Sequence, residues 1–493
     1  MGVEAVQNTI FPWDATDRYD LVLVGTGFGS SFFLQKALQV NRRRNFRVLC
    51  LEWGGVASHA WRIEHKKFAP IDASETYVTS SPGKPWWFTM GFGGGTNCWG
   101  ANAPRFHPTD FALKTRYGVG RDWPYSYDDL EPYYLEAEQI MDMAGDDDVA
   151  AVLPRSGPYP QRMHRLSTPD EAMKRANPQW HFGSASARMI AAKGDRGACC
   201  AIGNCSFCHV NSKFTVENGM PDLYADPRVS LIPGARVLRV ETQGDVASGV
   251  IYAFDGVEHR VAGDMIVLGA NAIHAPFILL KSGFDHPLIG RGLHEKAGFA
   301  AEVLLDGMNG FDGAVFNPGV NYALYDGEHR RTAGAVLIST QSAVWSHGLR
   351  LERGRWRQSL PLSVSVENLA EDVNGVTAEG DLPNVTHGDF SAYAKAGIAR
   401  ARAALAEVFS ALPVEDVVFR YTHRTQGHMQ GTLRMGTDPA ESIVDGNQIH
   451  HRFRNLAVVG SSVFPSCSAS NPSLTVAATA LRAADRLYRS GRT

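Results

Sequence analysis

The stretch "YDLVLVGTGFGSSFFLQKALQV", residues 19–40, decides the fold. An apolar run leads into a glycine turn and then into apolar residues at helical spacing, which predicts a strand, a tight turn and a helix. In such a unit Gly25 permits the turn, and Gly27 lets a pyrophosphate approach the backbone amides at the helix N-terminus. Ser30 occupies the third position of the G-x-G-x-x-G pattern. The stretch therefore predicts a Rossmann-like dinucleotide site, with an ordinary glycine turn as the alternative.

A second apolar run, "FRVLCLEWG" at residues 46–54, places an acidic side chain at the end of the next strand. Glu52 lies at about the distance along the chain, ~20 residues or more, at which a carboxylate takes the ribose hydroxyls of a dinucleotide. A carboxylate there favours an unphosphorylated ribose. This unit alone leaves FAD and NAD open.

Composition and charge narrow the class of protein. The chain has 493 residues, a formal net charge of -3 and 44% apolar residues, which is typical of a globular protein and gives no reason to expect nucleic acid as a partner. Residues 1–20 lack a basic segment followed by an apolar run, so no secretory signal is expected. No window approaches the ~20 apolar residues of a membrane span, so direct membrane insertion is not expected either.

Three further stretches carry a family resemblance. "GFGGGTNCWGANAPRFHPTDF" (91–111), "HMQGTLRMGTDPAESIVDGNQIHH" (428–451) and "NLAVVGSSVFPSCSASNPSLTVAATALRAADRL" (455–487) resemble the glucose-methanol-choline (GMC) family of FAD oxidoreductases, and the resemblance spans the chain. Within it, "YGVGRDWPYSYDDLEPYYLEAE" (117–138) is similar to the bacterial sugar and gluconate dehydrogenase flavoprotein subunits. "CWGANAPRF" (98–106) resembles pyranose oxidase-like enzymes.

The resemblance implies an α/β fold with two domains. A Rossmann-like FAD-binding domain of the p-hydroxybenzoate hydroxylase-like type is expected from residues 1–110, 195–295 and 440–493. An α+β substrate-binding domain built on an antiparallel sheet is expected from residues 296–439. Residues 111–194 are expected to form an excursion that acts as a lid or partner surface, or a plain surface connection.

The resemblance also implies the residues that hold FAD. Glycines 93 to 95 have no side chain, so their backbone can lie against a planar ring or a phosphate. Cys98 stands where pyranose oxidase carries a histidine bonded to flavin, so non-covalent FAD is expected, with a cysteinyl link as the alternative. With the residues of the first two segments, the expected FAD-binding residues are Gly25, Gly27, Ser30, Glu52, Gly94, Gly95, Thr96, Asn97, Cys98, Val237, Ala270, Gly460, Pro472 and Thr475.

His428 and Asn471 are the expected catalytic residues, because they match the family's active-site pair. Oxidation of an alcohol requires a proton to leave the oxygen as a hydride leaves the carbon, and a neutral imidazole can take that proton near neutral pH. A neutral amide can orient the hydroxyl oxygen without competing for the proton.

The stretch "GDRGACCAIGNCSFCHV", residues 194–210, contains four of the seven cysteines of the chain. The sugar dehydrogenase branch carries a similar cysteine run that holds a three-iron cluster, so the expected ligands of an iron-sulfur cluster are Cys199, Cys200, Cys205 and Cys208. Two residues separate the last two cysteines where that branch has three, and His209 replaces a proline. Zinc, disulfides and an inert loop are the alternatives.

These observations predict FAD-dependent oxidation of a hydroxyl of a sugar, glycoside or related polyol. Electrons would leave through the iron-sulfur cluster to an external acceptor such as a cytochrome. An oxidase that releases hydrogen peroxide is the alternative, and a non-catalytic electron-transfer or scaffold subunit is the rival of another class. Related dehydrogenases have a small subunit that bears the export signal, so the expected location is the cytoplasm or, by co-export with such a subunit, the periplasm.

Overall fold

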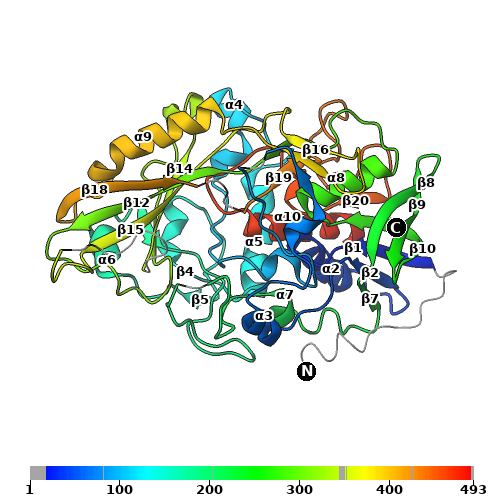
Figure 1. Cartoon of the computed structure of the whole chain (residues 1–493), viewed down its shortest axis with the longest axis horizontal. Coiled ribbons are helices and arrows are strands. Elements are labelled where there is room, and N and C mark those ends of the chain that lie inside the picture. Colours follow the sequence, from blue (N-terminus) through cyan, green and yellow to red (C-terminus); the bar gives the residue numbers. More distant parts are fainter. Residues whose placement is uncertain are drawn as a thin grey trace.

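The fold is that of a computed structural model, which describes residues 18–489 except 82, 204, 343–349, 351, 424 and 426. Most of residues 1–20, for which no secretory signal is expected, lies outside the described residues. Two large sheets stand at opposite ends of the view in Figure 1, with helices α2, α5 and α10 between them. These helices are Phe28–Val40, Tyr127–Ile140 and Ser473–Arg489, and α10 packs against both of the others.

The first sheet has seven strands in the order β7-β2-β1-β10-β9-β8, with β20 paired to the end of β10. The neighbours of β1, together with β7 and β20, run parallel, whereas β8, β9 and β10 form an antiparallel meander. Residues 21–24 of β1 are buried, as expected for a strand covered on both faces. The strands are β1 (Arg18–Val24), β2 (Val48–Glu52), β7 (Val229–Pro233), β8 (Arg236–Gln243), β9 (Val246–Phe254), β10 (Val257–Leu268) and β20 (Leu456–Val458).

The second sheet has six strands, and every neighbouring pair is antiparallel. Helix α9 (Ala392–Val408) covers one face, where Ala401, Leu405 and Phe409 join a buried apolar cluster with the strands. Figure 1 shows α9 lying along this sheet. In sheet order the strands are β18 (Val414–Thr422), β12 (Ala297–Leu305), β15 (Ser359–Val366), β14 (Val336–Thr340), β13 (Gly319–Asn321) and β6 (His181–Gly183).

A third, five-stranded sheet lies beside α8 (Asn271–Lys281), and it shares a small apolar cluster with that helix. Its strands, in sheet order, are β19 (Gln430–Thr432), β11 (Arg291–His294), β16 (Gly375–Thr377), β17 (Asn384–Thr386) and β3 (Val78–Thr79). The remaining elements are α3 (His59–His65), α4 (Leu113–Tyr117), α6 (Thr168–Ala176), α7 (Val216–Gly219), the strand pair β4 (Ala144–Gly145) and β5 (Gln161–Arg162), and short 3-10 helices at Ala73–Thr76, Gly94–Thr96, Pro108–Phe111, Asp147–Ala151, Glu328–Arg331 and Ser461–Val463.

The predicted fold class is confirmed: a Rossmann-like sheet is combined with a second domain built on an antiparallel sheet. The strands of the seven-stranded sheet come from the three segments predicted for the FAD-binding domain. From the predicted excursion, residues 111–194, β6 adds an edge strand to the six-stranded sheet and α5 packs on α10. The domain boundaries themselves stay a prediction.

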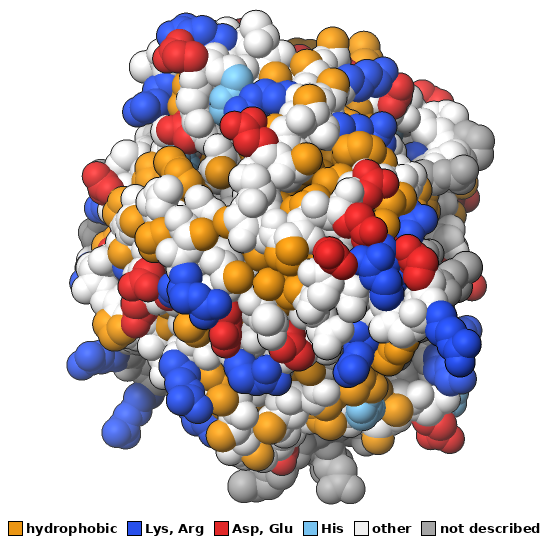
Figure 2. Space-filling view, turned by 90° about the vertical axis from the view of Figure 1, so that its left-hand side faces the viewer, with side chains coloured by type: hydrophobic (Ala, Val, Ile, Leu, Met, Phe, Trp, Pro, Cys, Tyr) orange, Lys and Arg blue, Asp and Glu red, His pale blue; other side chains and the backbone are white. Residues whose placement is uncertain are grey.

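The surface agrees with the near-neutral charge of the chain. On the face that Figure 2 shows, at the end of the six-stranded sheet, Lys and Arg side chains are interspersed with Asp and Glu. Of the helices among the described residues, none has both the length and the apolar character that crossing a membrane requires.

Candidate active site

A cavity of about 1400 Å³ lies where the carboxyl ends of β1 and β2 meet the six-stranded sheet. One side is lined by the glycine turn after β1 and by the loop at residues 94–95. The opposite side is lined by residues of β14 and β15, by His428 and by Asn471. We call these two parts the cofactor side and the substrate side. Ligands of open α/β sheets bind outside the carboxyl ends of the strands, so this position suits a dinucleotide.

The cofactor side begins with the glycine turn after β1. Gly25 has a φ of +88°, and a Cβ atom there would lie 2.8 Å from the carbonyl oxygen of Gly269, so this position requires glycine. Gly27 is the N-cap of α2 and offers no side chain to the first amides of the helix. Those amides and the helix dipole are therefore available to an anion at the cavity wall.

Close backbone contacts shape the rest of the cofactor side. A Cβ atom on Gly94 would lie 2.9 Å from the Cα of Gly27, and one on Gly29 would lie 2.8 Å from the amide nitrogen of Gly460. Gly95 lines the cavity, and a Cβ atom on it would meet no protein atom within 4 Å. Gly29 was not among the predicted residues, although its place in the "GTGFGSS" run is the signal that could have found it.

Glu52 lines the cavity at the end of β2, as the sequence predicted. Its Oε2 accepts hydrogen bonds from the backbone amide of Thr26 (3.0 Å) and from the Thr26 hydroxyl (2.7 Å), and its Oε1 accepts one from the amide of Gly54 (3.1 Å). Burial raises the pKa of this carboxyl, and the hydrogen bonds oppose that shift. The carboxylate is thus held rigidly beside the glycine turn.

The residues on this side fit FAD. A turn of bare backbone at a helix N-terminus suits a pyrophosphate, and the open space over Gly95 leaves room for a planar ring. Val237 and Ala270 line the same cavity, as do Gly460 and Pro472. Cys98 also lines it; burial raises the pKa of its thiol, which makes a reactive thiolate less available there.

Four predicted cofactor residues have side chains outside the cavity lining. The Ser30 hydroxyl donates to the carbonyl of Val24 (3.3 Å), and the Thr96 hydroxyl donates to the carbonyl of Gly93 (2.7 Å). Asn97 donates through Nδ2 to the carbonyl of Phe92 (2.8 Å). The Thr475 hydroxyl lies 2.8 Å from the hydroxyl of Tyr134, between α10 and α5. These side chains support the walls, and their direct contact with FAD stays a prediction.

His428 lies on the substrate side, in the loop before β19. Its backbone amide donates to Oε2 of Glu295 (3.2 Å), and its Nδ1 is buried without a hydrogen-bond partner among the described residues. Burial of the ring lowers the pKa of His428 well below its ordinary value, and the nearby cations of Lys296 and Lys84 lower it further. The imidazole is therefore neutral near neutral pH and able to accept a proton.

Asn471 faces the same cavity from the loop before α10, and both ends of its amide are bonded to the protein. Oδ1 accepts a hydrogen bond from Nζ of Lys296 (2.6 Å), and Nδ2 donates to the carbonyl oxygen of Asn102 (2.6 Å). One N–H of Asn471 remains for a substrate oxygen. Lys296 and Glu295 were not predicted, because no motif marks a lone charged pair in "LHEKAG".

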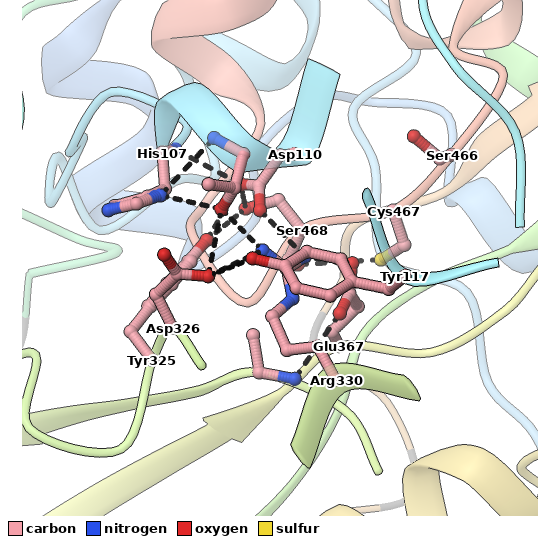
Figure 3. Close-up of polar contacts among 12 residues, drawn as sticks. His107, Asp110, Tyr117, Tyr325, Asp326, Arg330, Glu367, Ser466, Cys467 and Ser468 are labelled. Atoms are coloured by element: carbon pink, nitrogen blue, oxygen red, sulfur yellow. Dashed lines mark hydrogen bonds and ion pairs between the residues drawn. The ribbon is translucent and has the colours of Figure 1, made fainter. Parts of the chain in front are cut away.

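A buried ionic network supports the loop that carries Asn471 (Figure 3). Arg330 donates to Asp110 (2.9 Å) and to Glu367 (2.7 Å), and all three side chains are fully buried. The Tyr325 hydroxyl donates to Asp110 (2.7 Å) and lies 2.8 Å from the Ser468 hydroxyl. Because a buried charge needs its partners, this network fixes the segment around Ser468 against the substrate domain.

Two further bonds complete the support of that loop. The Ser468 hydroxyl donates to Asp110 (2.8 Å) and accepts the backbone amide of Ser470 (3.0 Å). Asn471 follows directly in the chain, so its position depends on these contacts. Precise placement of this kind is what a reacting group needs.

Small polar side chains line the wall opposite the glycines. Ser339 of β14 and Ser363 of β15 are paired across the two strands, and Ser365 lies one step further along the same face of β15. All three line the cavity together with Asn317 and Gln341. This part of the cavity offers hydroxyl and amide groups beside the apolar side chains of Phe316 and Leu337.

The structure gives no support for the predicted cluster site at the four cysteines of residues 199–208. Cys205 lines the cavity, Cys200 is exposed, and the Cys208 sulfur accepts the amide of Ser212 (3.2 Å). Among the residues that the structure describes, no three His, Cys, Asp or Glu side chains are arranged to hold a metal ion. The expected iron-sulfur cluster is therefore unsupported, and so is the zinc alternative. The spacing in the sequence brings the thiols into one loop without turning them toward a common centre.

A dinucleotide cradle and a neutral imidazole on one cavity are typical of a flavin-dependent oxidoreductase. Comparison with known proteins specifies the family: models of the N- and C-terminal parts of the GMC oxidoreductases match residues 92–297 and 388–480, which together exceed half of the chain. The protein belongs to the GMC oxidoreductase family, and FAD is the cofactor that this family and the site support.

Relatives align along nearly the whole chain. The fructose dehydrogenase large subunit of Gluconobacter japonicus is 25% identical, with 95% of this chain and 97% of that protein aligned. The 6'''-hydroxyparomomycin C oxidase of Streptomyces lividus is 24% identical, with 96% and 91% aligned. The solved structure of pyridoxine 4-oxidase from Mesorbium loti shares the fold, with a TM-score of 0.66, 17% identity and coverage of 96% of this chain and 99% of that one.

Proposed function

We propose that this protein oxidises a hydroxyl-bearing carbon of a sugar, glycoside or related polyol to a carbonyl, with FAD as the hydride acceptor. One observation carries the proposal. The glycine cradle, the neutral imidazole of His428 and the oriented amide of Asn471 line a single cavity. Cofactor and alcohol can therefore meet in one cavity.

The roles of the residues follow from their chemistry. FAD, when bound, supplies a ring that accepts a hydride. His428 lines the cavity and accepts the proton of the substrate hydroxyl, which its neutral state allows. Asn471 donates its remaining N–H to the substrate oxygen and holds that oxygen in place. The cradle of Gly25, Gly27 and Gly94 holds the pyrophosphate, and Glu52 stands at the end of β2 for the ribose.

The substrate class rests on the polar wall. Ser339, Ser363 and Ser365 present hydroxyl groups in rows, a pattern suited to several hydroxyls of one ligand. The names of the two curated relatives, a fructose dehydrogenase subunit and a hydroxyparomomycin oxidase, support a sugar-like substrate. The polar segment before His428, "YTHRTQG" at residues 421–427, agrees with this class.

An external electron acceptor is the second part of the proposal. The name of the fructose dehydrogenase large subunit supports such an acceptor and a partner subunit. In this form of the function, a cytochrome receives the electrons. The oxidase relative supports the alternative, in which dioxygen takes the electrons and hydrogen peroxide forms. No step is assigned to the four cysteines, because the described residues do not bring them into a cluster site.

Anaerobic mixing of the FAD-loaded protein with a panel of sugars, glycosides and polyols tests the proposal. We expect at least one of them to bleach the flavin absorbance, and we expect an artificial acceptor to restore it faster than dioxygen does. Bleaching followed by rapid peroxide formation in air would favour the oxidase. A flavin that no alcohol reduces would contradict the proposal and favour a non-catalytic subunit.

A further inference from the structure

Lys296 is a buried amine at the centre of the substrate side. It lies between β11 and β12, only 2% of its surface is exposed, and it lines the cavity. Its Nζ donates hydrogen bonds to Oδ1 of Asn471 (2.6 Å), to Oγ of Ser365 (2.9 Å) and to the carbonyl oxygen of Ala469 (3.2 Å). Within the described part of the chain, Lys296 forms no ion pair with a carboxylate.

A buried ammonium without a counter-ion is costly, so such a lysine demands an explanation. The other buried lysines near this cavity differ. Lys84 pairs with Glu295, and Lys213, which is not in the cavity lining, donates to three backbone carbonyls. Lys296 lines the cavity, donates one of its hydrogen bonds to Asn471, and its charge acts on His428.

The contacts of Lys296 decide which way the Asn471 amide points. An ammonium group can only donate, so the atom that faces it must be Oδ1, and the carbonyl of Asn102 can only accept, so the atom that faces it must be Nδ2. Without Lys296 the oxygen of the amide loses its partner, and rotation of the side chain would turn the amide away from the geometry suited to the substrate oxygen.

The charge of Lys296 acts on the second member of the pair. Burial lowers the pKa of Lys296 to about 7. While the amine is protonated, it lowers the pKa of His428, which makes the imidazole a weaker proton acceptor. When the amine loses its proton to water, the imidazole becomes a stronger acceptor, and the neutral amine can still donate to Asn471 and Ala469 while accepting from Ser365.

The remaining titratable groups around these two residues leave this coupling intact. Cys467 faces Lys296, and burial raises the pKa of its thiol to about 12, so it is neutral across the relevant range. Lys84 also faces His428 but carries its own partner, Glu295. Burial lowers the pKa of Lys84 to about 7 as well. Variants of Lys296 are therefore needed to distinguish the effect of its charge on His428 from that of Lys84.

We propose that Lys296 is a positioning residue for the reacting pair: its amine holds the amide of Asn471 toward the substrate oxygen, and it is a charged neighbour of His428. This inference rests on the proposed function. It adds Lys296 to the two reacting residues, His428 and Asn471. It also makes the rate of flavin reduction depend on pH.

Three variants test it: Lys296→Met removes the donor and the charge, Lys296→Arg keeps a permanent cation, and Lys36→Met is the control. Lys36 is equally buried and pairs with Glu136, away from the cavity lining. FAD content is measured first, and then the rate of anaerobic flavin reduction by the best polyol as a function of pH. A reduction rate that rises with pH through the pKa of Lys296 is expected for the wild type.

The expected results separate positioning from general stability. In Lys296→Met, reduction should slow by roughly 10- to 100-fold, because the amide of Asn471 loses the hydrogen bond that orients it toward the reacting oxygen. The rise near neutral pH should vanish in both Lys296 variants and persist in Lys36→Met. A Lys296→Met protein that keeps both the rate and the rise would overturn the proposal, and a rise retained in both Lys296 variants would assign it to Lys84.

A further measurement does not depend on turnover, so it applies even if no polyol reduces the flavin. Competitive acetylation of the wild-type protein, followed by mass spectrometry, measures the protonation of Lys296 against pH. Half-reaction near neutral pH supports the proposal, and titration at the ordinary lysine pKa of about 10.4 would overturn it. If no polyol reduces the wild-type flavin, the proposed function fails, whereas the acetylation result still stands on its own.

Discussion

The two sides of the cavity are built in different ways. On the cofactor side, backbone lies against backbone, as at Gly27 with Gly94 and at Gly29 with Gly460. On the substrate side, the wall consists of side chains such as Lys296, Ser363 and Asn471, which come from strands and loops far apart in the sequence. Backbone contacts leave a readable glycine pattern, whereas side-chain walls leave none. The cofactor side should therefore be intolerant of added atoms, and the substrate side tunable.

The largest effect is expected from Gly29→Val, which adds atoms to the backbone contacts of the cofactor side. The added side chain would enter the backbone of Gly460, which cannot move without displacing the strand end that carries it. We expect loss of FAD binding and a large fall in folded yield, measured as flavin absorbance per protein. Gly380→Ala, at an exposed loop where a Cβ atom meets nothing within 4 Å, is the matched control and should bind FAD normally. Normal FAD content in Gly29→Val would refute the tight contact.

A second variant, His428→Ala, changes the substrate side of the cavity and leaves the cofactor side intact. His428→Ala should retain FAD but lose roughly 10²- to 10⁴-fold in the rate of flavin reduction, the usual contribution of a general base. His286→Ala, whose ring contacts the backbone carbonyl of Pro439 at the surface, should behave like the wild type. Equal rates in His428→Ala and the wild type, measured by stopped-flow absorbance, would remove His428 from the mechanism.

A smaller effect is expected on the polar wall. Ser363→Ala should raise the KM for the best polyol by roughly 2- to 10-fold, the value of one neutral hydrogen bond, with a smaller change in kcat. Ser230→Ala, on β7 in the other large sheet, serves as the control. Steady-state kinetics with an artificial acceptor give both constants. An unchanged KM would show that Ser363 does not contact the substrate.

The smallest effect concerns the cysteine loop. Cys200 is exposed and absent from the cavity lining, so Cys200→Ser should leave the rate of flavin reduction by a polyol unchanged. The same preparation is analysed for iron and acid-labile sulfide, which we expect to be absent. Stoichiometric iron that disappears in Cys200→Ser would reinstate the cluster that the sequence predicted.

The sequence predicted the fold, and most of the residues that it predicted for FAD line the cavity. Strand, glycine turn, helix and the acid at Glu52 are all local features, and each constrains the backbone within a few residues. The twelve predicted FAD and catalytic residues that line the cavity include every glycine of the predicted FAD-binding set. The side chains of Ser30, Thr96, Asn97 and Thr475 instead form hydrogen bonds within the protein, outside the cavity lining.

On the substrate side, the sequence predicted only His428 and Asn471, the residues that match motifs of the family. Lys296 and Glu295 follow a short strand with no motif, and their role arises from contacts with residues more than a hundred positions away. The network of Arg330, Asp110 and Glu367 likewise joins three distant segments. The iron-sulfur cluster stays a prediction, because proximity in sequence does not by itself orient four thiols around one centre, and the described residues do not show such a centre.

The most direct test of the account is single-turnover reduction of the FAD-loaded protein by the best polyol, compared with the same compound deuterated at the reacting carbon. We expect the flavin to bleach, and to bleach more slowly with the deuterated compound, because the C–H bond breaks as hydride leaves. We also expect both rates to fall in His428→Ala at full FAD content. Failure of every polyol to bleach the flavin of the wild-type protein would contradict it.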